Sequence, residues 1–213
     1  MPSEKRKKLD EEKKIKTKNN LINSAIEIFI KKGYHQTNIS DIVAFANLGQ
    51  GTFYRNFRSK REVFEEILKK MIQELIFEFS DGNLNINNMP KSFDEYKDKS
   101  IKSFLKIIPI IKKNKKIVIL FFRDAPTIDK EFEQEINDIF EQFSSIAQYY
   151  LDHAIKQKFI RNCNSSLVAE SIVGMGIQHI KNWLHGKYSD SEIEKIVIET
   201  NNLIFLGLLT PSV

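Results

Sequence analysis

The chain has 213 residues, of which 41% are hydrophobic, 11% aromatic and 29% charged, and this composition is typical of a globular protein with a core. Its one cysteine, Cys163, excludes an internal disulfide and a multi-cysteine zinc site. The longest apolar run, Ile117 to Phe122, is far shorter than the roughly 18 residues of a membrane span. We therefore expect a cytoplasmic protein without a membrane partner.

The positive charge is concentrated at the front of the chain. Residues 1–61 carry 14 Lys/Arg and 6 Asp/Glu, whereas residues 62–213 carry 19 and 22. A regional basic excess is typical of a segment that meets a polyanion, either nucleic acid or an anionic membrane surface. Residues 1–18 form a basic arm, which can enter a flanking minor groove of DNA, add counterion release or remain a solvated tail.

Apolar residues at helical spacing predict helices at 13–32, 39–46, 50–57 and 59–79 in the first part of the chain. Gly33 ends the first of them, because glycine supplies the left-handed residue of a helix C-terminus. Asn38 and Asp41 form a capping-box-like start for the second, with Thr37 as the alternative cap. The stretch Asn47-Leu48-Gly49 predicts a tight turn before the third.

Further helices are predicted at 93–113, 117–122, 127–157, 165–185 and 189–209. Pro109 is expected to kink or interrupt the first of these. The run Ile117 to Phe122 has β-propensity, but no second strand exists to pair with it, so a short buried helix fits better. The expected fold class is all-α, with about nine helices.

Three short helices with a tight turn between the second and third have the outline of a helix-turn-helix. Leu48, Phe53 and Phe57 can anchor the inner side of the third helix. Its outer side offers hydrogen-bond donors and acceptors without a carboxylate, as insertion into the major groove of DNA requires. These outer residues are Gln50, Gly51, Thr52, Tyr54, Arg55 and Asn56.

The stretch Ile22 to Phe64 resembles the DNA-binding domain of TetR-family transcriptional regulators. The resemblance is carried by Ile28-Phe29, Gly33-Tyr34, Thr37, Asp41-Ile42-Val43, Ala46-Asn47-Leu48, Gly51-Thr52-Phe53-Tyr54, Phe57 and Ser59-Lys60. Two positions depart from the family pattern: Asn47 stands where glycine is common, and Gly49 where Ser or Thr often caps the recognition helix. Both fit the fold, because Asn tolerates the left-handed conformation and Gly is an acceptable cap.

The resemblance implies a ligand-responsive regulator, in the simplest form a homodimeric repressor that a small effector releases from a pseudo-palindromic operator. After the basic arm (1–18), which the charge pattern gives, the resemblance implies a DNA-binding domain (19–61) and an effector-binding and dimerisation domain (62–213). It also implies phosphate contacts for Thr37, Tyr54 and Lys60. The candidates for contact with base edges are Gln50, Thr52, Arg55 and Asn56, since Arg favours guanine and Asn or Gln favours adenine.

Residues 62–213 hold 12 of the 16 phenylalanines, and the resemblance implies an effector cavity between their helices. The segment Leu120 to Ala125, followed by Phe132, is similar to that of family members responding to lipophilic or acyl-CoA ligands. Aromatic residues at helical spacing are also common in an ordinary core. The candidate pocket residues are Phe104, Ile108, Phe121, Phe122, Phe143, Tyr150, Met175, His179 and Trp183.

The last two predicted helices are apolar on more than one face, so one face can pack inward while the other needs a partner. A two-fold four-helix dimer interface satisfies this requirement and is the usual arrangement in the family. The candidate interface residues are Ile172, Gly176, Ile180, Ile196, Leu203 and Ile204.

An enzyme is the competing class. The four histidines lack metal-ligand spacing, Cys163 has no CxxC partner, and Gly174-Met175-Gly176 follows no strand. We therefore expect no catalysis, no cofactor and no metal. A second alternative is a helical small-molecule-binding protein whose helix-turn-helix does not read DNA.

Overall fold

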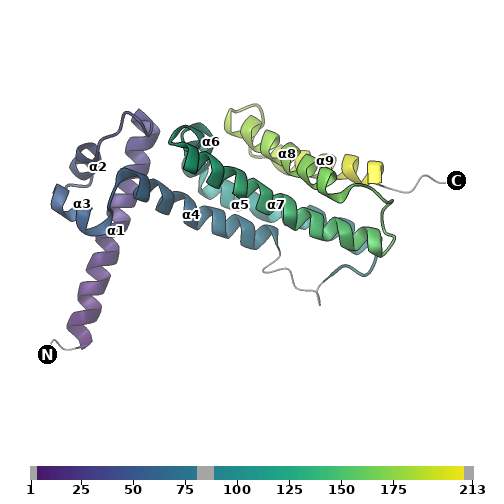
Figure 1. Cartoon of the computed structure of the whole chain (residues 1–213), viewed down its shortest axis with the longest axis horizontal. Coiled ribbons are helices and arrows are strands. Elements are labelled where there is room, and N and C mark those ends of the chain that lie inside the picture. Colours follow the sequence, from purple (N-terminus) through teal and green to yellow (C-terminus); the bar gives the residue numbers. More distant parts are fainter. Residues whose placement is uncertain (1–3, 81–88, 209–213) are drawn as a thin grey trace. The chain divides into compact units, whose positions relative to one another are not determined.

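The computed structural model describes residues 4–80 and 89–208, which form nine α-helices, one short 3-10 helix and no strand. This confirms the predicted all-α class (Figure 1). No helix within those ranges is long and apolar enough to cross a membrane. The elements are α1 (Glu4–Lys32), α2 (Ile39–Phe45), α3 (Gln50–Asn56), α4 (Lys60–Phe79), α5 (Phe93–Lys113), α6 (Lys115–Arg123), η2 (Ala125–Thr127), α7 (Lys130–Lys156), α8 (Ser165–Leu184) and α9 (Ile193–Leu208).

The chain divides into two compact units. The N-terminal unit comprises residues 1–71 and 116–128, and the C-terminal unit comprises residues 72–115 and 129–213. Helix α4 therefore begins in one unit and ends in the other. Helix α6 belongs to the N-terminal unit with α1, α2 and α3, although it lies within the sequence range expected for the effector-binding domain.

Local capping defines the three N-terminal helices. Gly33, with φ of 79°, ends α1 and donates its N–H to the Phe29 carbonyl, as the sequence predicts. The Asn38 N–H donates to Asp41 Oδ2 at 2.9 Å, so Asn38 is the cap of α2 and Thr37 is not. Asn47 has a φ of 53°, which confirms its left-handed turn conformation, and Gly49 precedes α3 as its N-cap.

The start of α1 differs from its predicted start. The helix begins at Glu4, nine residues before the predicted start, because its first turns carry no apolar stripe that could reveal them. They carry acid-to-base pairs four residues apart instead: Glu4 and Lys8, Asp10 and Lys14, Glu12 and Lys16. Such pairs stabilise an exposed helix by about 0.2–0.5 kcal/mol each.

Two other helix starts, those of α7 and α9, correct the sequence-based expectation, whereas α5 keeps its predicted bounds. Helix α5 spans Phe93–Lys113 as predicted and continues through Pro109, so the proline does not interrupt it. Helix α7 begins at Lys130 rather than residue 127, because Pro126 lies in η2 and the Asp129 side chain accepts from the Phe132 N–H at 2.8 Å. Helix α9 begins at Ile193, after a turn in which Ser189 Oγ donates to Glu192 Oε2 at 2.6 Å.

Aromatic packing holds the helices of the N-terminal unit together. The centres of the Phe29 and Phe64 rings lie 5.5 Å apart in an edge-on arrangement, and the centres of the Tyr34 and Phe64 rings lie 5.2 Å apart. Phe29, Phe53 and Phe64 are completely buried. Since α1 and α4 share this cluster, the start of α4 is fixed against the helices that precede it.

The core of the C-terminal unit joins α5, α7, α8 and α9. It is built around Tyr96, Leu151, Ala154, Ile160, Ala169, Phe205 and Leu208. The Tyr96 and Phe205 rings meet edge-on at 5.6 Å, which ties α5 to α9. This packing fixes the helices that surround the pocket described below.

Candidate DNA-binding surface and ligand pocket

Helix α3 presents a polar outer face and an apolar inner face. Phe53 is fully buried, and Phe57, its C-cap, is 2% exposed, so these rings anchor the helix as predicted. Gln50, Gly51 and Arg55 are exposed, and so is Tyr54, whose exposed fraction is 58%. The outer face carries no carboxylate, which removes the main electrostatic obstacle to approaching a DNA groove.

Two hydrogen bonds orient the polar residues of α3. Arg55 Nη2 donates to Thr52 Oγ1 at 2.8 Å, and Asn56 Nδ2 donates to the Thr52 carbonyl at 2.8 Å. Thr52 and Asn56 are half-buried, whereas Arg55 is exposed. Of the candidates for base contact, Gln50 and Arg55 therefore have the freest access to a ligand.

Thr37 and Lys60, the other two candidates for phosphate contact, form hydrogen bonds with the turn between α1 and α2. Thr37 is 1% exposed, and its hydroxyl donates to the Gly33 carbonyl at 2.7 Å. Lys60 Nζ donates to the Tyr34 and Thr37 carbonyls at 2.7 and 2.8 Å and lies 4.2 Å from the centre of the Tyr34 ring. Burial lowers the pKa of Lys60. This geometry favours a structural role for Thr37 and leaves one of the three Lys60 N–H groups for a phosphate.

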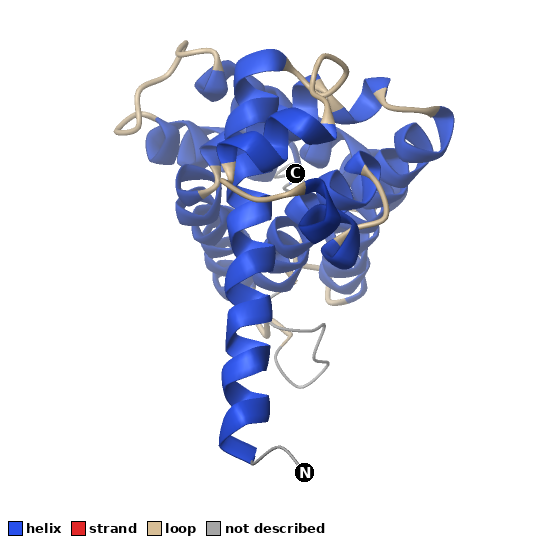
Figure 2. Ribbon diagram, turned by 90° about the vertical axis from the view of Figure 1, so that its left-hand side faces the viewer, coloured by secondary structure: helices blue, strands red, loops and turns tan. Residues whose placement is uncertain are grey.

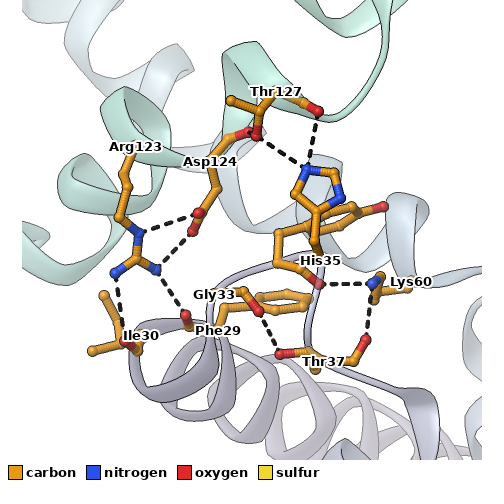
Figure 3. Close-up of polar contacts among 10 residues, drawn as sticks. Phe29, Ile30, Gly33, His35, Thr37, Lys60, Arg123, Asp124 and Thr127 are labelled. Carbon is orange, nitrogen blue, oxygen red and sulfur yellow. Dashed lines mark hydrogen bonds and ion pairs between the residues drawn. The ribbon is translucent and has the colours of Figure 1, made fainter.

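A polar junction joins the end of α6 to the end of α1 within the N-terminal unit (Figure 3). Arg123 Nη2 donates to the Phe29 carbonyl at 2.8 Å and to Asp124 Oδ2 at 2.8 Å. The hydrogen bond to Asp124 raises the pKa of Arg123. His35 Nε2 lies 3.0 Å from the Thr127 carbonyl and 3.1 Å from its hydroxyl.

This junction connects the α1–α2 turn to α6 and η2, and none of its residues is among the predicted site residues. Asp124 is 7% exposed, so its carboxylate depends on Arg123 for charge compensation. The Arg-Asp pair at the end of an apolar helix could have indicated a buried ion pair. The sequence offered no sign of its partner on α1, however, because Phe29 is more than 90 residues away along the chain. The junction therefore ties the end of α6 to the end of α1 and to the α1–α2 turn.

A pocket lies within the C-terminal unit, between residues of α4, α5, α7 and α8. Most of its lining is apolar or aromatic, and the polar side chains come mainly from α5. Lys99 Nζ lies 5.4 Å from the centre of the Tyr150 ring. Burial raises the pKa of the Tyr96 hydroxyl well above its usual range. The lining residues are Phe79, Pro90, Tyr96, Lys99, Ser100, Ser103, Phe104, Ala147, Tyr150, Leu151 and Ile172.

The predicted pocket residues are distributed over several places. Phe104 and Tyr150 line the pocket, and Phe143 packs edge-on against the lining residue Phe79 at 5.4 Å. Phe121 and Phe122 lie in α6, which belongs to the N-terminal unit. The others are not in the lining: Ile108 is buried in α5, Met175 and His179 lie half-buried in α8, and Trp183 is buried and donates Nε1–H to Asp190.

The predicted dimer residues are distributed over both sides of α8 and α9. Leu203 is 66% exposed, and Leu206, a neighbour on α9, is 71% exposed. Ile172 lines the pocket, and a Cβ at Gly176 would lie 3.9 Å from the Phe104 ring, so both are oriented inward. The half-buried members are Ile180, Ile196 and Ile204.

Metal binding has no support in the described ranges. Among residues 4–80 and 89–208, no three His, Cys, Asp or Glu side chains lie together in a group that could hold a metal ion.

Comparison with known proteins connects these features to a family. Residues 21–67, which contain α2, α3 and the start of α4, match the family model described as bacterial regulatory proteins of the tetR family. The fatty acid metabolism regulator protein of Bacillus subtilis is 24% identical over 185 residues, covering 84% of this chain and 90% of that protein.

Two solved structures share the fold. A TetR-family transcriptional regulator from Syntrophomonas wolfei superposes with a TM-score of 0.73 at 20% identity, covering 92% of this chain and 98% of that one. FadR from Bacillus subtilis in complex with stearoyl-CoA has a TM-score of 0.65 at 20% identity, covering 85% of this chain and 96% of that one. The chain therefore carries a helix-turn-helix of the tetR family of bacterial regulatory proteins at residues 21–67, and it shares its fold with a TetR-family transcriptional regulator over 92% of its length.

Proposed function

We propose that the protein is a repressor that binds an operator as a homodimer and releases it when a small, mainly apolar effector enters the C-terminal unit. The acid-free outer face of α3 is the observation that carries the DNA-binding part, because Gln50, Tyr54 and Arg55 are all exposed on it. As a regulator of this kind it acts in the cytoplasm, where bacterial DNA lies, and needs no catalytic group.

The pocket supports an effector with an apolar body and an acidic head. Its lining is mainly apolar, with a few polar groups that could orient a ligand, which is the usual composition of a small-molecule site. Phe79, Phe104 and Leu151 supply apolar wall, whereas Lys99 and Ser103 supply a cation and a hydroxyl. Since the structurally similar FadR of Bacillus subtilis was solved in complex with stearoyl-CoA, a long-chain acyl-CoA is the first effector to test.

Helix α4 begins in the N-terminal unit and ends at the pocket residue Phe79, so it can transmit ligand binding directly, and a second candidate for this transmission is helix α6. It follows α5 and precedes α7, and both of these helices contribute lining residues to the pocket. Its own C-terminal end is hydrogen-bonded to the end of α1 through Arg123. A ligand that shifts α5 or α7 would therefore displace the base of the DNA-binding helices, which changes operator affinity if the two states bind DNA differently.

The proposal predicts that stearoyl-CoA weakens operator binding. The operator is first selected from a random duplex library with the purified full-length protein, and its dissociation constant is then measured by fluorescence anisotropy. Saturating stearoyl-CoA should raise this constant by about 5- to 150-fold, the usual range of coupling between two sites. Coenzyme A without the acyl chain is the matched ligand control and should have little effect.

Two variants separate ligand binding from its transmission. Ala147→Trp fills the pocket and should abolish stearoyl-CoA binding and release together, because Ala147 lines the cavity. Arg123→Met combined with Asp124→Asn, which leaves no buried charge unpaired, should retain both stearoyl-CoA binding and operator binding but lose most of the release, because it removes the hydrogen bonds to α1. An unchanged operator affinity in the presence of bound stearoyl-CoA would contradict the proposed effector. A selection that recovers no preferred duplex would favour a helical ligand-binding protein that does not read DNA.

The exposed leucines of α9 support the dimer. Leu206→Ala should raise the dimer dissociation constant about tenfold or more in sedimentation equilibrium, because a large apolar side chain leaves the interface of both protomers. Leu9→Ala is the matched control, since Leu9 is also exposed, at 51%, but lies in α1. If both variants dimerise like the parent protein, the interface lies elsewhere.

A further inference from the structure

The first part of α1 is a helix that extends beyond the packed part of its own unit. Residues 6–16 are all exposed, and burial begins with the half-buried Thr17 and Lys18 and the fully buried Leu21. Figure 2 shows this segment as one uninterrupted helix up to its N-terminal end. We refer to residues 4–18 as the helical arm. It lies outside the family-model match, which starts at residue 21.

One narrow stripe along α1 holds basic residues and no carboxylate. Arg6, Leu9, Lys13, Lys16 and Asn20 are spaced alternately three and four residues apart, so they form one stripe along the helix. Asp10 and Glu12 border this stripe, each about 40° around the helix from its nearest basic residue, and Glu12 is the helix-stabilising neighbour of Lys16, whereas Glu11 lies on another side. A stripe that bound a partner helix would be apolar, whereas this one contains a single apolar side chain. Its charge complements a row of phosphates.

The stripe leads directly to the DNA-binding helices. Asn20, its last member, donates from Nδ2 to the Ala46 carbonyl in the turn between α2 and α3, at 3.0 Å. Lys18 lies 5.4 Å from the centre of the Phe57 ring, which caps α3. The arm therefore leaves the N-terminal unit beside both ends of the recognition helix, whereas the other end of α1 contacts Arg123.

We propose that the helical arm binds DNA phosphates flanking the recognised sequence through Arg6, Lys13 and Lys16. Residues 4–16 form a helix about 20 Å long, at 1.5 Å per residue. This length spans about six base pairs at 3.4 Å each. A helix is better suited than a flexible tail, because its basic residues are already aligned and lose less conformational entropy on binding. The inference rests on the proposed DNA binding and adds a second contact region to it.

The test compares two triple variants with the same loss of charge. The stripe variant carries Arg6→Gln, Lys13→Gln and Lys16→Gln, and the matched control carries Lys7→Gln, Lys8→Gln and Lys14→Gln on other faces of the arm. Each full-length protein is titrated with the selected operator, once trimmed to the recognised sequence and once with ten extra mixed base pairs at each end. Circular dichroism checks that both variants keep their helix content.

On the extended duplex, the plot of log affinity against log salt concentration should be less steep for the stripe variant. Its negative slope should decrease in magnitude by about 2.7 per subunit, because each of three lost phosphate contacts contributes about 0.9. Its affinity at 0.1 M salt should fall at least about tenfold. The salt slope and the affinity of the control variant should change much less. On the trimmed duplex, the two variants should have similar affinities. Equal losses for both variants, or a loss that ignores duplex length, would overturn the role of the arm while leaving operator binding intact. Failure of the parent protein to bind either duplex would instead overturn the proposed function.

Discussion

Phe53→Ala should destabilise the DNA-binding helices by about 3–5 kcal/mol, the usual cost of removing a fully buried phenylalanine ring. Phe53 has no exposed surface, and its ring lies 5.9 Å from Phe57 and 5.6 Å from Tyr54. Helix α3 has only seven residues, too few to be stable in isolation, so it depends on this anchor. Operator binding should be lost together with the ordered helix.

Hydrogen exchange of the full-length protein measures this effect locally. The amides of α3 should exchange about 100-fold faster or more in Phe53→Ala, since each 1.4 kcal/mol corresponds to about a factor of ten when exchange follows local opening. Phe45→Ala is the matched control, because Phe45 is 56% exposed on α2 and its removal should cost little. Similar exchange in both variants would mean that α3 is held by something other than its inner aromatic face.

Local signals made the helices of the N-terminal unit predictable. Gly33, Asn38 and Asn47 each act through the conformation or hydrogen bonding of their own neighbourhood, so their residue types indicate helix ends and turns. The inner and outer faces of α3 follow from spacing alone. The start of α1 was missed because an exposed helix stabilised by charge pairs has no apolar periodicity, the signal on which the assignment relied.

The pocket and the junction depend on contacts that sequence spacing does not encode. Phe104 and Phe121 both occupy apolar faces of helices, yet one lines the pocket and the other belongs to the N-terminal unit. Lys99 and Ser103 were not predicted, because a polar residue on a helix is normally solvent-exposed and only the packing of α5 with α7 and α8 turns them toward a cavity. The hydrogen bond between Arg123 and the Phe29 carbonyl was not predictable either, because the two residues are 94 positions apart in the sequence.

Arg55→Ala should remove most of the sequence discrimination of the protein. Arg55 is exposed on α3, and its hydrogen bond to Thr52 Oγ1 holds the guanidinium in one direction before DNA arrives. An arginine that reads guanine O6 and N7 contributes about 1–3 kcal/mol of discrimination. We therefore expect specific affinity to fall by about 5- to 150-fold at each half-site, with a much smaller loss on random duplex.

The measured quantity is the ratio of dissociation constants for random and selected duplexes at one salt concentration. Arg58→Ala is the matched control, because Arg58 is also exposed but follows the C-cap of α3. A phosphate contact at Arg58 would weaken both duplexes alike and leave the ratio unchanged, since phosphates carry no sequence information. If Arg55→Ala also left the ratio unchanged, Arg55 would be a backbone contact, and sequence reading would depend on Gln50 and the partly buried Thr52 and Asn56.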